Sequence, residues 1–112
     1  MVTIYHNPRC KKSRAGLDYA REKGMQPEVR EYLKEPLSEE ELRMLLMKLH
    51  IKPRELIRTQ EEYFKKVLKG LSLNDDEWIK EMIENPKLIK RPIVEEKYKA
   101  VIGDPVENID LL

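Results

Sequence analysis

Apolar and polar residues alternate at intervals that predict a β-α-β unit in the first third of the chain. Residues 2–5 are apolar and β-rich, and Asn7-Pro8 ends this strand because proline cannot continue a central ladder. A helix is expected from about residue 10 to residue 23, and Gly24 is its C-terminal stop. Residues 28–33 alternate and predict a second strand. A helix between two strands indicates a parallel pair joined by a right-handed crossover.

The middle of the chain has the pattern of amphipathic helices. Ser38 followed by Glu41, and Asn74 followed by Glu77, each have the spacing of a capping box, which marks the start of a helix. Between these two helices, a short helix is expected to begin at Pro53 and to contain Arg54 to Arg58. Apolar residues follow each capping box at helical spacing and form the predicted buried faces: Leu42, Leu45, Leu46 and Leu49, then Trp78, Ile79, Met82 and Ile83.

The last third of the chain predicts two more strands and a closing helix. Residues 93–94 and 100–102 are β-rich, and the polar linker between them is short enough for an antiparallel hairpin. A short helix is expected at residues 106–112. We therefore expect one α/β domain, residues 1–112, with a four-stranded mixed sheet flanked by helices. A helical insertion at about residues 37–86 separates its β-α-β and β-β-α halves.

Charge and composition exclude several function classes. Lys and Arg total 22 against 21 Asp and Glu, and a net charge of +1 argues against a general binder of nucleic acids or membranes. We find no apolar run of membrane-spanning length and no apolar signal-peptide region. One cysteine and two histidines without ligand spacing provide neither a disulfide framework nor a metal site. We expect a cytoplasmic monomer with no metal, no nucleic-acid partner and no membrane partner.

The only cysteine, Cys10, follows a strand and a turn and lies where the first helix is expected to begin. The free N–H groups and the dipole at a helix N-terminus favour a thiolate, which is the reactive form of cysteine. The alternative is an inert, buried cysteine with solvated basic neighbours. Ser13 stands where a C-x-x-C motif has its second cysteine, so a redox cycle needs an external thiol. The flanking basic residues are Arg9, Lys11, Lys12 and Arg14.

Two distant arginines are candidate ligands for an oxyanion. A planar guanidinium matches the geometry of a phosphate-like group and can bind it through two hydrogen bonds. Arg58 ends the ELIR segment, and Arg91 precedes Pro92 at the entry to a strand, where a cis peptide bond is possible. Their spacing alone leaves an ordinary surface arginine as the alternative for each.

Three segments resemble the glutaredoxin-dependent arsenate reductase (ArsC) family: IYHNPRCKKSR at 4–14, RELIR at 54–58 and NPKLIKRPIV at 85–94. The resemblance covers nearly the whole chain and implies a thioredoxin-like fold. It implies that arsenate is attacked by a cysteine thiolate, that glutathione resolves the adduct as co-substrate, and that glutaredoxin reduces the mixed disulfide. No bound cofactor is required. The implied site residues are Cys10 as nucleophile, Arg58, Arg91 and Arg14 for substrate binding, and His6, Asn7, Ser13 and Pro92 as supports.

One segment departs from the family pattern. Arsenate reductases of this type have a third arginine just after the last strand, where residues 100–105 read AVIGDP. A carboxylate at Asp104 weakens an oxyanion site by unfavourable charge. Two alternatives to arsenate reduction therefore stay open. One is a thiol-disulfide oxidoreductase acting on glutathione mixed disulfides, and the other is an Spx-like transcription regulator that binds RNA polymerase, although Ser13 argues against a C-x-x-C switch.

Overall fold

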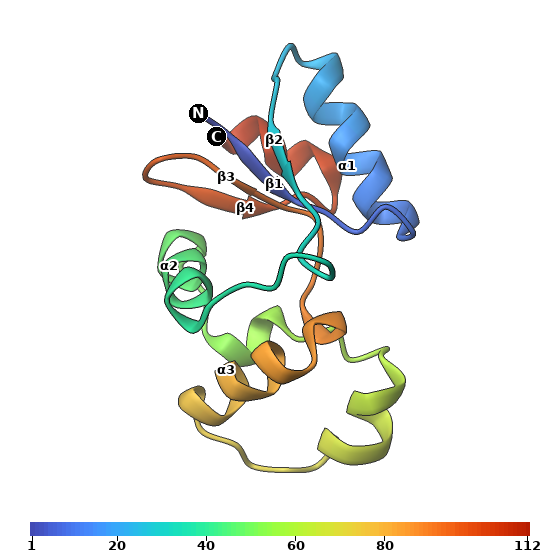
Figure 1. The fold of residues 1–112 in the computed structure, drawn as a ribbon, viewed down its shortest axis with the longest axis vertical. Coiled ribbons are helices and arrows are strands. Elements are labelled where there is room, and N and C mark those ends of the chain that lie inside the picture. Colours follow the sequence, from blue (N-terminus) through green and yellow to red (C-terminus); the bar gives the residue numbers. More distant parts are fainter. The chain divides into compact units, whose positions relative to one another are not determined.

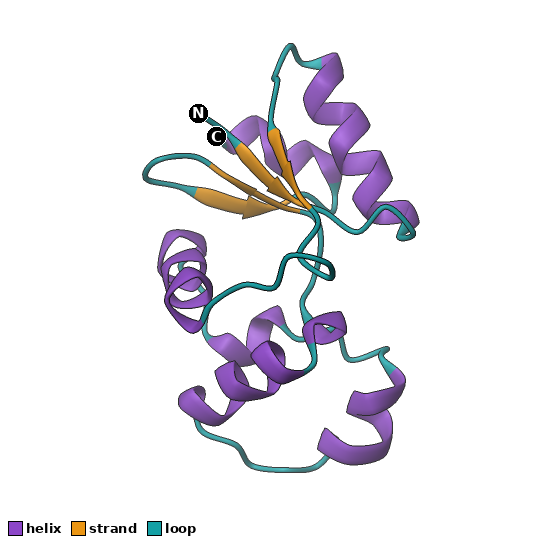
Figure 2. Cartoon of the chain, in the orientation of Figure 1, coloured by secondary structure: helices purple, strands orange, loops and turns teal.

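The computed structural model describes residues 1–112, which form two compact units. The first unit comprises Met1–Glu35 and Arg91–Leu112 and contains the β-sheet. The second unit, Pro36–Lys90, is helical (Figure 2). No helix in either unit has the length and apolar character needed to cross a bilayer.

The first unit contains the expected mixed sheet of four strands, and the structure places them in the order β2-β1-β3-β4 (Figure 1). Strands β1 and β2 are parallel, whereas β1 with β3 and β3 with β4 are antiparallel. Ile4 of β1 lies opposite Val29 of β2 and Val94 of β3. The elements of this unit are β1 (Thr3–Tyr5), α1 (Lys11–Glu22), β2 (Glu28–Arg30), β3 (Ile93–Glu95), β4 (Ala100–Ile102) and the 3₁₀ helix η4 (Val106–Leu111).

Helices α1 and η4 pack on one face of this sheet (Figure 1). Leu17 and Ala20 are three residues apart on α1, so both side chains lie on the helix face that meets the strands. Burying this cluster holds α1 against the strands β1 and β3. The buried cluster consists of Ile4, Leu17, Ala20, Val94 and Ile109.

The second strand is shorter than the pattern predicts. We expected residues 28–33, but β2 ends at Arg30. The N–H groups of Lys34 and Glu35 both donate to the carbonyl of Glu31, so the chain turns there. The apparent alternation continued past the strand because Tyr32 is buried in that turn.

The second unit begins its two main helices at the predicted capping boxes. Ser38 caps α2 (Glu39–Leu49) with Glu41, and Asn74 caps α3 (Asp75–Glu84) with Glu77. The expected buried faces form, although Leu49 and Ile83 are only half-buried. Three short helices complete the unit: η1 (Pro53–Leu56), the π-helix η2 (Phe64–Leu68) and η3 (Pro86–Leu88).

Helix η1 does not extend to Arg58 as the sequence suggested. It stops at Leu56, because Ile57 leaves the helix to pair with Ile89 in an antiparallel bridge. The N–H of Arg58 then donates to the carbonyl of Leu88 at 2.7 Å. Arg58 is therefore held by a long-range backbone contact within this unit rather than by a helix.

Candidate active site

Cys10 is the N-cap residue of α1, at the position that the sequence predicted for it. Its backbone is extended (φ −93°, ψ 122°), so the chain enters the helix from a turn. The N–H of Cys10 donates to the carbonyl of Asn7 at 3.0 Å, and the carbonyl of Cys10 accepts the N–H of Arg14 at 3.0 Å. The side chain is half-buried. This geometry directs the thiol toward the unpaired N–H groups of the first helical turn.

The surroundings of Cys10 lower the pKa of its thiol. Burial acts in the opposite direction and is the largest single contribution, but it is outweighed. The backbone N–H of Ser13, the side chain of Arg91 and the backbone N–H of Lys12 together favour the thiolate. The N–H groups lie near Sγ without completing a side-chain capping bond, so they act mainly as dipoles.

Ser13 connects β1 to the first turn of α1 through two buried hydrogen bonds. Its Oγ accepts the backbone N–H of Asn7 at 3.0 Å and lies 2.7 Å from Nδ1 of His6. The pKa of His6 is lowered, first by burial and further by the charges of Arg21 and Arg14, against an opposing effect of Glu31. The Ser13 hydroxyl donates to Nδ1 in one tautomer of the His6 ring and accepts from it in the other, because Oγ has a second lone pair beside the one that accepts from Asn7.

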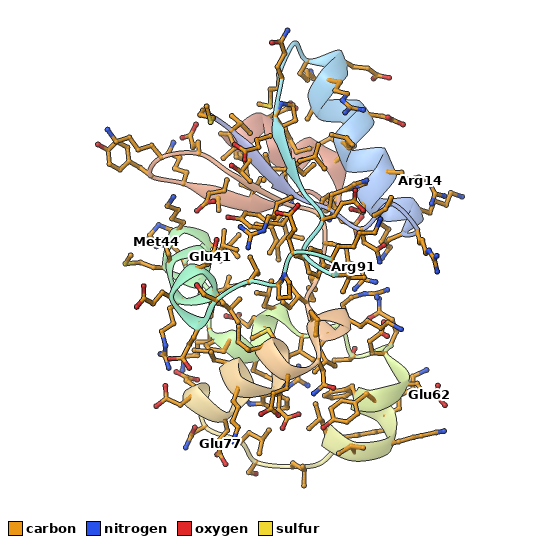
Figure 3. All side chains as sticks on the ribbon, viewed as in Figure 1. Arg14, Glu41, Met44, Glu62, Glu77 and Arg91 are labelled. Atoms are coloured by element: carbon orange, nitrogen blue, oxygen red, sulfur yellow. The ribbon has the colours of Figure 1, made fainter.

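Three more predicted site residues, Arg91, Pro92 and Arg14, belong to the first unit. Arg91 is 8% exposed and hydrogen-bonds to Cys10 through its side chain. The Arg91-Pro92 peptide bond is cis. Nη1 of Arg14 donates to the carbonyl of Pro8 at 3.0 Å and so closes the loop before Cys10. Figure 3 labels Arg14 and Arg91, which both lie toward the end of α1 where the helix begins.

Gly16 allows α1 to lie directly against Pro92, a contact that the sequence analysis missed. A Cβ at position 16 would be 2.5 Å from Cγ of Pro92 and 3.3 Å from the carbonyl oxygen of Gly103. The N–H of Gly103 donates to the carbonyl of Pro92 at 2.8 Å. A glycine inside a helical pattern was the available signal, because such a residue commonly marks a close approach.

The carboxylate of Asp104, which the sequence analysis named as an unfavourable charge, pairs with the first turn of α1, and that pairing was not predicted. Nζ of Lys12 lies 3.1 Å from Oδ2 of Asp104, and the two side chains are 59% and 41% exposed. Asp104 precedes a second cis peptide bond, to Pro105. Lys12 and Asp104 are distant in sequence, so no local spacing could have indicated this pair.

Arg58 belongs to the helical unit, and its approach to Cys10 stays a prediction. Within that unit its Nη1 pairs with Oε2 of Glu61 at 2.5 Å. Neither side chain is fully exposed. The described residues include no group of three or more His, Cys, Asp or Glu side chains placed to hold a metal ion.

Comparison with known proteins agrees with the resemblance seen in the sequence. The model of the ArsC family matches residues 5–112. The chain is 46% identical to the uncharacterized protein YfgD of Escherichia coli, over 96% of this chain and 92% of that one. It is 42% identical to an arsenate reductase of Haemophilus influenzae, over 96% and 95% of the two chains.

Two solved structures match over almost the whole chain. A putative arsenate reductase from Yersinia pestis is 43% identical, with a TM-score of 0.91 and complete coverage of both chains. An arsenate reductase from Vibrio cholerae is 41% identical, with a TM-score of 0.92 and coverage of 99% and 97%. These matches confirm the thioredoxin-like fold with its helical insertion. The chain therefore belongs to the ArsC family and is an oxidoreductase.

Proposed function

We propose that this protein is a monothiol reductase whose Cys10 thiolate attacks arsenate, with glutathione and glutaredoxin completing the cycle. The observation that carries the proposal is the placement of Cys10 at the N-cap of α1. There the N–H groups of Ser13 and Lys12 and the side chain of Arg91 lower the pKa of the thiol. Several relatives of similar length are named arsenate reductases, which supports arsenate as the substrate.

The proposed reaction needs one protein thiol and two external ones. The Cys10 thiolate forms a bond to arsenic, and one arsenate oxygen leaves as water after protonation. The thiolate of glutathione then attacks the Cys10 sulfur and forms a mixed disulfide. The electron pair of the S–As bond stays on arsenic, which leaves as arsenite. A thiol of glutaredoxin attacks the mixed disulfide and frees Cys10. Cys10 is the only cysteine in the chain, which suits this division of labour.

The residues around Cys10 have separate roles in this proposal. Arg91, buried beside the thiol, both stabilises the thiolate and binds an oxygen of the substrate. Arg58 and Arg14 supply further charge to the oxyanion. His6, Asn7, Ser13 and Pro92 are positioning residues, because they hold the loop and the first helical turn on which the substrate oxygens rest. We further propose that the protein works as a cytoplasmic monomer.

A coupled assay tests the proposed reaction. NADPH oxidation is measured with arsenate, glutathione, glutaredoxin and glutathione reductase, and the protein is compared with Cys10→Ser. We expect arsenate-dependent oxidation that the variant lacks, while circular dichroism shows that the variant is folded. Serine is a good N-cap residue, so α1 should persist in the variant. Arsenate turnover by Cys10→Ser, or none by the unmodified protein, contradicts the proposal.

One observation favours a second candidate function, reduction of glutathione mixed disulfides. The carboxylate of Asp104 pairs with Lys12 at the first turn of α1, where a multiply charged anion would be repelled. A mixed disulfide has no such charge at its sulfur atoms. Cys10-dependent deglutathionylation of a model peptide, without arsenate turnover, would select this second function.

A further inference from the structure

The backbone and the side chain of Lys12 have different partners in the structure. Its backbone N–H belongs to the first turn of α1 and favours the Cys10 thiolate. Its ammonium group instead lies 3.1 Å from Oδ2 of Asp104. The positive charge of Lys12, two residues after Cys10, is therefore paired with a carboxylate from the segment after β4. The side chain of Lys12 is not an uncompensated cation at this site.

The backbone that carries Asp104 is held in place on both sides. The N–H of Gly103 donates to the carbonyl of Pro92, and the carbonyl of Gly103 lies against the helix backbone at Gly16. The side-chain amide of Asn108 donates to the carbonyl of Ile102 at 3.0 Å. These contacts fix the backbone of the segment against α1 at Gly16. The backbone at Asp104 is thus held by the fold, and the exposed carboxylate meets the long Lys12 side chain from that position.

A carboxylate at this point discriminates among anions by their charge. Its repulsion of a bound anion is proportional to the charge on that anion, so a second negative charge doubles the penalty. It also competes with the anion for the ammonium of Lys12. Because an exposed ion pair is weak, the ammonium of Lys12 can leave Asp104 and bind the anion, but the loss of the pair reduces the gain in binding free energy. Arg91 is buried beside the thiol, so its charge is available to every anion that reaches Cys10.

We propose that Asp104, through its pair with Lys12, is a specificity-determining residue of the Cys10 site. It lowers the affinity for doubly charged tetrahedral oxyanions relative to singly charged ones, so the preferred substrate form is a monoanion or a neutral electrophile. This inference rests on the proposed function only in placing the substrate at Cys10 and the first turn of α1. It names the charge class of that substrate.

Two inert tetrahedral anions provide the test, sulfate with two charges and perchlorate with one. Each anion's half-protecting concentration is measured from the alkylation rate of Cys10 by iodoacetamide, at constant ionic strength and pH. Rates are normalised to the anion-free rate of the same variant, which removes effects on thiol reactivity. The variants are Asp104→Asn, Lys12→Gln and the double variant. Glu62→Gln, which removes a carboxylate from an exposed ion pair of the helical unit, is the matched control (Figure 3).

In Asp104→Asn we expect the half-protecting sulfate concentration to fall about three- to tenfold, and that of perchlorate to fall by less than about threefold. Lys12→Gln should weaken protection by sulfate. In the double variant, Asp104→Asn should lower the half-protecting sulfate concentration by a smaller factor, because the Lys12 ammonium that it would free for the anion is absent. Glu62→Gln should leave both anions unchanged.

Equal changes for both anions, no change in Asp104→Asn, or no protection in any variant overturns the inference. Circular dichroism of each variant identifies a loss of fold, and Asp104→Glu, which keeps the charge, should retain the discrimination against sulfate. The assay contains neither arsenate nor glutathione. Charge discrimination without arsenate turnover would therefore refute the proposed function alone. Arsenate turnover with no effect of Asp104→Asn on the two anions would refute this inference alone.

Discussion

Nδ1 of His6 lies 2.7 Å from Oγ of Ser13, and this buried contact joins the end of β1 to the first turn of α1. The backbone N–H of Asn7 donates to the same Oγ. One hydroxyl therefore holds together the loop and the helix that present Cys10. Because Ser13 is fully buried, water cannot replace it as a partner.

Ser13→Ala is expected to lower the free energy of unfolding by about 1–3 kcal/mol, since it leaves two buried polar groups without their partner. Urea denaturation measures the change. The loosened first turn should also slow the alkylation of Cys10 at neutral pH. As a control, Ser72→Ala changes a serine on the exposed surface of the helical unit and should leave both measurements unchanged. Unaltered stability of Ser13→Ala would contradict the role given to this hydroxyl.

Arg91, rather than the basic residues next to Cys10 in sequence, is expected to control the thiol. Arg91→Gln removes a side-chain hydrogen bond and a charge that both lower the pKa of Cys10. The midpoint of the pH profile for alkylation should therefore move to higher pH. Arg9→Gln removes an exposed neighbouring charge, and its midpoint should move less because solvent screens that charge. A larger shift in Arg9→Gln would reverse this assignment.

Lowering the pH is expected to destabilise the fold through His6. Its pKa in the folded protein is lowered, chiefly by burial, so the unfolded chain binds the proton more readily. The contribution of neutral His6 is complete above the unfolded pKa of about 6.5 and is lost as pH falls toward the lower folded value. Thermal unfolding of the protein and of His6→Gln between about pH 4.5 and about pH 8 measures it. The variant should lose less stability over this range, and parallel curves would refute the prediction.

Gly16→Ala should destabilise the protein although alanine is the better helix former. The added Cβ would lie 2.5 Å from Cγ of Pro92, so α1 must move away from the sheet. Overpacking of this kind costs about 1–3 kcal/mol, which exceeds the gain of about 1 kcal/mol in helix propensity. Ala15→Gly at the neighbouring exposed position is the matched control. Glycine should be the worse residue at position 15 and the better one at position 16, as measured by urea denaturation.

Local patterns in the sequence were sufficient for most elements of the fold. Each capping box, at Ser38 and at Asn74, acts within one helical turn, so residue spacing alone predicts where the helix begins. The proline after β1 likewise ends a strand by a local effect. The same holds for Cys10, because a turn followed by a helix start defines an N-cap wherever the helix lies in the fold. The prediction for β2 was too long, since a local alternation does not distinguish a strand from a turn with one buried tyrosine.

The tertiary structure decided which groups surround the thiol. Arg91 reaches Cys10, Asp104 pairs with Lys12, and Pro92 lies against Gly16, and each contact joins segments far apart in the chain. Such contacts depend on the order of strands in the sheet and on the side on which α1 packs, and no spacing in the sequence encodes them. The sequence alone therefore determined that Cys10 begins a helix, whereas the packing of β3 and β4 beside that helix decided the charges that the thiol meets.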